Sequence, residues 1–157
     1  MPVDYVSFEE ARAAKGLRMT VVPGIPSPWS EAAKGIFHVK RLPWKAVRLD
    51  ARNDAMAEWA KERSAPVAFF DDEPPRGSWT QILLLAERLA PTPSLLPADP
   101  LERARAFGIA HEICGEDGLV WVACAGAEND PAPGEVDKID AADAEVVDSV
   151  EVGTQPT

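Results

Sequence analysis

The segment 126–157 limits what this chain can fold into more than any other feature. It contains nine acidic residues, a single basic residue (Lys138) and no aromatic residue, so it carries −8 of the chain's net charge of −10. Most of its apolar residues are Ala or Val, and three prolines interrupt it. Such a segment cannot bury enough apolar surface to offset the entropy lost on ordering. We therefore expect a disordered acidic tail and a single folded core within the first 125 residues.

The composition also argues against several classes of protein. The net charge of −10 disfavours binding to a nucleic-acid backbone, although the first 125 residues carry only −2 of it. The chain lacks a run of about 18 apolar residues, so we expect no membrane partner. Residues 1–16 contain no apolar signal core, which predicts a cytoplasmic protein. Cys114 and Cys124 are too few for a disulfide framework or a zinc site, so we expect no metal.

Prolines divide the remaining sequence into alternating strand and helix candidates. Three prolines within residues 23–28 forbid a regular element there, and Ser27 and Pro28 suit the N-cap and first position of a helix. The order β-α-β-α-β-β-α, followed by one more helix, predicts an α/β fold with a mixed sheet and helices on both faces. We expect strands at 17–22, 44–49 and 67–70, a turn with room for a fourth strand at 71–77, and helices at 28–42, 54–63, 80–89 and 101–115.

With these residues in this order, the chain resembles the N-terminal thioredoxin-like domain of a glutathione S-transferase. Ser27-Pro28-Trp29-Ser30 lies between the first strand and the first helix, where that family keeps a Ser, Cys or Tyr. Ala65-Pro66-Val67 is similar to the family's Val-Pro-Val segment, which contains a cis proline. Residues 82–89 resemble its Ala-Ile-x-x-Tyr-Leu helix, and residues 95–104 resemble the linker before its all-helical second domain. The match extends over residues 17–121.

The resemblance implies a division of the chain, with two departures from the family. It gives an N-terminal extension with one or two helical turns at 1–16, a thioredoxin-like glutathione-binding domain at 17–90, a linker and first helix of a truncated helical domain at 91–125, and the acidic tail at 126–157. The family continues with further helices, so a truncated gene or a frameshift would explain this pattern. The family also has Glu-Ser before its third helix, where the nearest counterparts here are Trp79 and Thr80, without an acid.

The resemblance further implies a glutathione site. It makes Ser27 the catalytic residue, whose hydroxyl would donate to the glutathione sulfur and stabilise the thiolate at the positive end of a helix. A plain N-cap role for Ser27 is an equal alternative. Ser30 is a second candidate if the register is shifted, although a serine there also suits a solvent-facing position. The predicted glutathione-binding set is Ser27, Trp29, Ser30, Ala65, Pro66, Trp79 and Thr80.

Two readings of the function stay open, and with them the question whether the chain is an enzyme. The first is a glutathione transferase-like detoxification enzyme, which uses glutathione as a co-substrate and attacks a small electrophile. The second is a non-catalytic thioredoxin-fold binding or interaction module, or a truncated remnant of a glutathione transferase. The missing Glu-Ser pair and the missing helices favour the second. The resemblance also allows a homodimer. The absence of Cys at positions 27 and 30 argues against dithiol redox chemistry.

Overall fold

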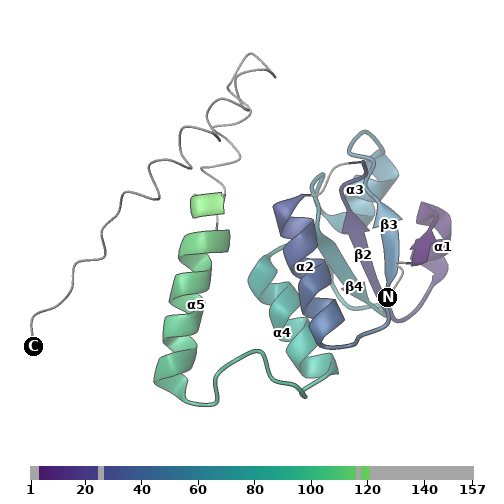
Figure 1. The fold of residues 1–157 in the computed structure, drawn as a ribbon. Helices are drawn as coiled ribbons and strands as arrows, with labels where there is room; N and C mark the ends of the chain where they lie inside the picture. Colours follow the sequence, from purple (N-terminus) through teal and green to yellow (C-terminus); the bar gives the residue numbers. More distant parts are fainter. Residues whose placement is uncertain (1–3, 25–26, 116–117, 121–157) are drawn as a thin grey trace, which may run out of the picture.

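The computed structural model describes residues 4–24, 27–115 and 118–120. One sheet runs through the described part of the chain in the order β1-β3-β2-β4, with β4 antiparallel to β2 and the other neighbours parallel. Helices α2 and α4 lie side by side on one face of the sheet, and α5 stands apart from it (Figure 1). The strands are β1 (Asp4–Val6), β2 (Leu17–Val21), β3 (Lys45–Arg48) and β4 (Val67–Phe70), and the helices are α1 (Phe8–Ala13), α2 (Pro28–Val39), α3 (Asp54–Ala60), α4 (Trp79–Leu89) and α5 (Pro100–Cys114).

The larger core lies between the sheet and the helices α2 and α4. Phe37 of α2 and Ile82 and Leu85 of α4 belong to one buried cluster with Met19 and Val21 of β2. The two α4 residues are three positions apart, so they share one face of the helix. Burial of each large apolar side chain contributes roughly 1.5–3 kcal/mol. This cluster fixes α2 and α4 against the sheet.

The opposite face of the sheet is covered by α1 and α3. Ala11 of α1 and Met56 of α3 pack with Val47 of β3. Trp59 of α3 stacks on Phe69 of β4 with their ring centroids 3.7 Å apart. Because helices cover both faces, all five residues of β2 are buried. The prediction of a mixed sheet between two helical layers is confirmed.

Three details differ from the sequence-based expectation. The helix at Phe8–Ala13 is preceded by an edge strand, β1, which pairs in parallel with β3 and which the polar sequence did not indicate. The turn after β4 contains an isolated antiparallel bridge between Ala68 and Arg76 in place of a full fourth strand. Helix α3 ends at Ala60, because Lys61 adopts a positive φ of 62°. The predicted tail at 126–157 lies outside the described residues.

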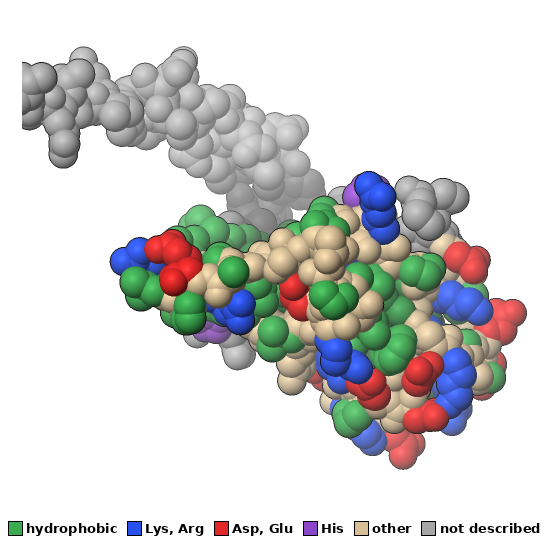
Figure 2. Space-filling model, turned by 90° about the horizontal axis from the view of Figure 1, so that it is seen from below, with side chains coloured by type: hydrophobic (Ala, Val, Ile, Leu, Met, Phe, Trp, Pro, Cys, Tyr) green, Lys and Arg blue, Asp and Glu red, His purple; other side chains and the backbone are tan. Residues whose placement is uncertain are grey.

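The described surface carries charges of both signs. On the face seen from below in Figure 2, Lys and Arg side chains lie beside Asp and Glu side chains. Glu73, for example, pairs with Arg76 at 2.5 Å and with Arg88 at 2.6 Å. Helices of the described part of the chain do not reach the length and apolar character that a membrane span requires.

Candidate functional site

A cavity of about 430 Å³ lies at the edge of the sheet where β2 and β3 end. These two strands are parallel, so their carboxyl ends meet at the same edge. Val22 and Leu49, which follow the two strands, both line the cavity. The carboxyl ends of parallel strands are the usual place for ligands in α/β sheets. The position of the cavity therefore follows from the topology.

The wall of the cavity is mostly apolar, and none of its described residues carries a charge. Helices α2 and α4 both begin at this wall, so the positive ends of their helix dipoles lie beside a wall without charged side chains. An anionic group of a ligand would be favoured at either helix start. Helix α2 and its N-cap supply Ser27, Pro28, Trp29, Ala32, Ala33 and Ile36; the loop before β4 supplies Ser64, Ala65 and Pro66; the start of α4 supplies Gly77, Trp79 and Ile82.

Ser27 holds the first turn of α2 and lines the cavity at the same time. It is the N-cap, Pro28 follows at the first helical position, and the Ser27 hydroxyl accepts the backbone N–H of Ser30 at 3.5 Å. A serine oxygen that accepts a hydrogen bond still has its own proton to donate. The cap role and a donor role toward the cavity are therefore compatible in one side chain.

The loop before β4 brings backbone to the cavity wall. The Ala65–Pro66 peptide bond is cis, as the resemblance implied, and both residues line the cavity. The hydroxyl of Thr20, which is fully buried in β2, accepts the backbone N–H of Val67 at 2.9 Å and fixes the start of β4. The described part of the chain supplies no hydrogen bond to the backbone of Ala65. That backbone can pair with an extended ligand.

The start of α4 corrects one sequence-based assignment. The N-cap is Ser78, in a capping box with Gln81, so Ser78 takes the place expected for Thr80. The Thr80 hydroxyl lies 3.0 Å from the Ser78 hydroxyl and outside the cavity wall. The residue before the cap is Gly77, and a Cβ at this position would overlap the carboxylate of Glu62. An acid from the segment after α3 therefore occupies the space beside the α4 start.

Five of the seven predicted residues come together at the cavity and two do not. Ser30 is buried, with 1% of its surface exposed, so it does not face solvent, and its hydroxyl has no hydrogen-bond partner within the described residues. Neither Ser30 nor Thr80 is part of the described cavity wall. The five residues that line it are Ser27, Trp29, Ala65, Pro66 and Trp79.

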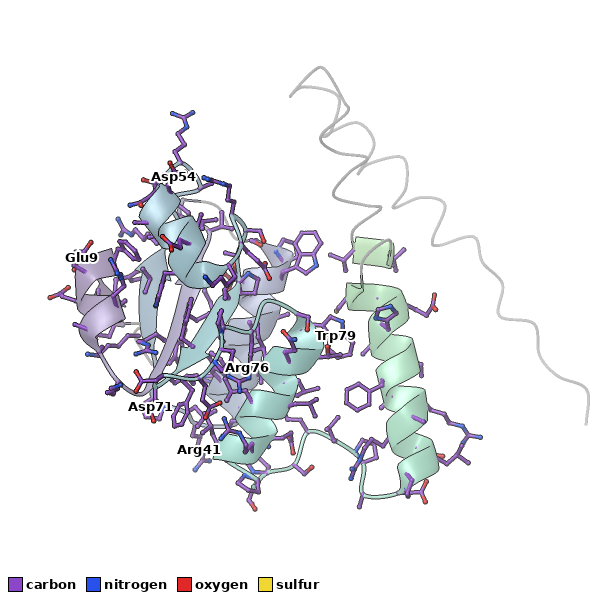
Figure 3. The ribbon with its side chains drawn as sticks, turned by 180° about the vertical axis from the view of Figure 1, so that it is seen from behind. Glu9, Arg41, Asp54, Asp71, Arg76 and Trp79 are labelled. Carbon is purple, nitrogen blue, oxygen red and sulfur yellow. The ribbon has the colours of Figure 1, made fainter. Side chains whose placement is uncertain are left out.

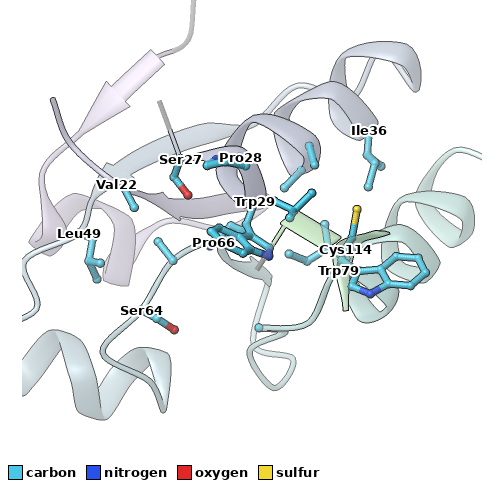
Figure 4. Close-up of a pocket in the computed structure, with 16 residues that line it drawn as sticks. Val22, Ser27, Pro28, Trp29, Ile36, Leu49, Ser64, Pro66, Trp79 and Cys114 are labelled. Atoms are coloured by element: carbon cyan, nitrogen blue, oxygen red, sulfur yellow. The ribbon is translucent and has the colours of Figure 1, made fainter. Parts of the chain in front are cut away.

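The far wall of the cavity comes from α5, which the sequence-based site did not include. Cys114, the last residue of α5, lines the cavity together with Val120. Ser27 and Cys114 lie on opposite sides in Figure 4. Trp79 of α4 lies 6.0 Å from Phe107 of α5 between ring centroids, on the side of α4 that faces α5 (Figure 3). In the sequence, Cys114 stands close to Glu112, a polar pattern that is equally typical of a solvated helix end, so it did not indicate the site.

Comparison with known proteins identifies the fold. No protein-family model and no curated protein matches the sequence. Among solved structures, a glutathione transferase homologue from Sulfitobacter with bound glutathione matches 87% of this chain and 71% of its own, at 20% identity and a TM-score of 0.58. A glutathione transferase homologue from Burkholderia with bound glutathione matches 72% of this chain and 64% of its own, at 20% identity and a TM-score of 0.54. This chain has the glutathione transferase fold.

The shared fold covers a part of the related proteins. A bacterial maleyl pyruvate isomerase, a glutathione S-transferase of the Zeta class, matches 61% of this chain but only 46% of its own length, at 20% identity and a TM-score of 0.54. The chain thus spans about half to two thirds of several glutathione transferases that it resembles. The four-stranded mixed sheet with its helices matches the thioredoxin-like N-terminal domain of these proteins. The predicted fold class is confirmed.

Proposed function

We propose that this protein binds glutathione in the cavity and stabilises its thiolate for attack on an electrophilic small molecule. One observation carries the proposal: Ser27, the N-cap of α2, lines the cavity with a hydroxyl whose proton is free to donate. Glutathione bound in the homologues from Sulfitobacter and Burkholderia supports the choice of ligand.

A glutathione transferase needs a thiolate at neutral pH. A free thiol has a pKa of about 8.5, so most of it is protonated near pH 7. A hydroxyl that donates to the sulfur and a helix N-terminus beside it both favour the anion and lower the pKa of the thiol. Ser27 supplies both effects, because its hydroxyl lies at the start of α2.

The rest of the tripeptide has complementary groups along the wall. The Ala65 backbone offers an N–H and a C=O to the cysteinyl part of glutathione, as an added strand would. The backbone amides at the start of α4, behind the Ser78 cap, suit the γ-glutamyl carboxylate. Glu62, whose carboxylate lies against Gly77 beside that helix start, suits the ammonium group.

The electrophile would bind in the part of the cavity opposite Ser27, against its apolar wall. Ile36, Trp79 and Cys114 surround this part of the cavity. In the reaction, a sulfur lone pair of the thiolate forms the new bond to carbon. The displaced electron pair leaves with a leaving group, or moves onto an adjacent electron-withdrawing group that then takes up a proton. An apolar wall excludes water and lowers the chance that the electrophile is hydrolysed instead.

A non-catalytic glutathione-binding or interaction module is the alternative. Gly77 favours it, because this residue carries no side chain where the resembled family has an acid. The homodimer, the cytoplasmic location and the detoxification role stay predictions that rest on the resemblance.

Calorimetric titration of the full chain with reduced glutathione and with S-methylglutathione tests the proposal. The proton released on binding is measured in two buffers of different ionisation enthalpy. We expect glutathione to bind with release of part of a proton near pH 7, and S-methylglutathione to bind without it. Ser27→Ala should keep binding and lose the proton release. No binding of either compound at millimolar concentration would overturn the proposal, and binding without any proton release would favour the non-catalytic module.

A further inference from the structure

Lys40, at the end of α2, is a buried cation with all of its donors in use. Its side chain has 0% of its surface exposed, and its Nζ lies 2.5 Å from Glu87 Oε1 of α4. The same Nζ donates to the backbone oxygens of Ala90 at 2.8 Å and Pro93 at 2.6 Å. An ammonium group has three N–H donors, so these three acceptors satisfy it. Burial of such a charge is costly unless all of its partners are in place.

Glu87 connects this cation to the segment that follows α4. Its Oε1 accepts the backbone N–H of Leu95 at 2.7 Å, and its Oε2 accepts the hydroxyl of Ser94 at 3.2 Å. Burial alone would raise the pKa of Glu87, but hydrogen bonds from Lys40 and from Leu95 outweigh it and lower the pKa. Lys40 and Glu87 therefore connect three parts of the chain: the end of α2, the last turn of α4, and residues 90–95. We call this the Lys40–Glu87 junction.

Among the described residues few contacts hold helix α5, so its position depends on the Lys40–Glu87 junction. None of its residues is buried, and Leu101 and Ile109 are 59% and 63% exposed. Within the described residues, α5 contacts the rest of the chain through the ring pair of Trp79 and Phe107 and through the bond from Arg103 Nε to the Pro97 oxygen at 2.8 Å. Residues 90–99 lead directly from the Lys40–Glu87 junction into α5. Their path therefore decides where α5 stands relative to the sheet.

We infer that Lys40 and Glu87 are positioning residues that hold α5 as the far wall of the cavity. Lys40 lies at the end of α2 and Glu87 in the last turn of α4, both remote from the cavity-lining starts of these helices. They act through the linker at 90–99, which sets where α5 and its Cys114 stand. The inference concerns the shape of the cavity, so it holds whether or not the cavity binds glutathione.

The alkylation rate of Cys114 by iodoacetamide tests this inference, measured by mass spectrometry in a Cys124→Ala background of the full chain. Lys40→Met keeps the length of the side chain and removes the charge. We expect it to raise the alkylation rate of Cys114 by about tenfold, because α5 leaves the cavity wall more often. Lys34→Met on the same helix breaks an ordinary surface pair with Glu31 and should leave the rate within about twofold of wild type.

Hydrogen exchange of the β2 amides separates this local effect from general destabilisation. If the alkylation rate rises while exchange of residues 17–21 stays unchanged, α5 moves independently and the inference stands. Glu87→Gln is the second variant, because it keeps an oxygen for Leu95 and should raise the rate by a smaller factor in the same direction. A wild-type rate in folded Lys40→Met and Glu87→Gln would overturn the inference, as would a rate that rises only in step with β2 exchange.

Discussion

At the scale of single residues, Ser27 combines a structural and a chemical role in one hydroxyl. Its oxygen caps α2 through a long, 3.5 Å bond from Ser30, which leaves its proton available to the cavity. Ser27→Ala should therefore cost about 1 kcal/mol of stability or less, as cap substitutions do. It should also lower kcat/KM for glutathione conjugation of a chlorodinitroarene by about 10- to 100-fold, because a hydrogen bond to a charged group contributes roughly 1.5–3 kcal/mol.

The N-cap of α1 offers a matched control for Ser27. Ser7 accepts a bond from Glu10 N at 3.2 Å, and neither residue lines the cavity. Ser7→Ala should show a similar loss of stability in urea unfolding and an unchanged kcat/KM. Equal losses of activity in Ser7→Ala and Ser27→Ala would show that the cap alone matters and would remove the chemical role of Ser27.

The second prediction at the residue scale concerns Glu62. Its carboxylate fills the space beside Gly77, at the start of α4, where an ammonium group of glutathione would meet it. Glu62→Gln should weaken glutathione binding by about tenfold in calorimetry, since one charge-assisted hydrogen bond contributes roughly 1.5 kcal/mol. Glu58→Gln, an exposed acid on α3, is the control and should bind as wild type. If glutathione binds equally to all three proteins, Glu62 has no part in the site.

The candidate site was predictable where local chemistry decides a residue's position. Ser27-Pro28 predicted the helix start, because a cap and a first-position proline are read from two neighbouring residues. Ser78 was missed because Trp79 and Thr80 follow it directly and the boundary of α4 depends on the Gln81 side chain of the capping box. Cys114 was missed because its place at the cavity depends on the path of residues 90–99, which no local pattern encodes.

At the scale of elements, the sequence pattern predicts strands β2, β3 and β4 and the helices that cover them, but it does not predict β1. Helices α2 and α5 begin as predicted, since each has a cap followed by proline. Strand β1 has only three residues and an exposed outer pattern, so it lacks the alternation that predicts a strand. Its existence depends on parallel pairing with β3, a contact between distant parts of the chain.

From the ion pair of Lys40 and Glu87 we can predict how the stability of the junction between α2, α4 and the linker changes at acidic pH. The pKa of Glu87 in the folded protein is lowered from 4.5, the value it regains on unfolding. A lowered carboxyl pKa contributes stability that is present above pH 4.5 and is lost as the pH falls through the folded value. Urea unfolding at a series of pH values should therefore show a shallower loss of stability below pH 4.5 in Glu87→Gln than in wild type.

Other carboxyl groups do not obscure this comparison. Glu73, whose pKa is lowered by hydrogen bonds from Arg88 and Arg76, is present in both proteins and cancels in the difference. Parallel pH curves for wild type and Glu87→Gln would mean that the buried pair makes no contribution to acid sensitivity. A steeper curve for the variant would reverse the sign of the argument.

At the scale of the whole molecule, two levels of stability are expected. The sheet holds buried clusters on both faces, so β2, α2, α4 and the helices opposite should open as one cooperative unit. Helix α5 has no buried residue and is fixed mainly by the linker, so its backbone bonds should open at a lower free energy. Native-state hydrogen exchange resolves the two levels: amides of α5 should exchange at least about 100-fold faster than those of β2.

Helix α4 is the internal reference, because it is close in length to α5 and buries Ile82, Leu85 and Ala86. The amides of α4 should exchange at about the same rate as those of β2, and more slowly than those of α5. A ligand that fills the cavity contacts the Cys114 wall, so saturating glutathione should slow exchange in α5 more than in α1, which lies on the other face of the sheet. If α5 is as protected as β2 without ligand, the helix belongs to the main cooperative unit, and the wall that it forms is rigid before any ligand binds.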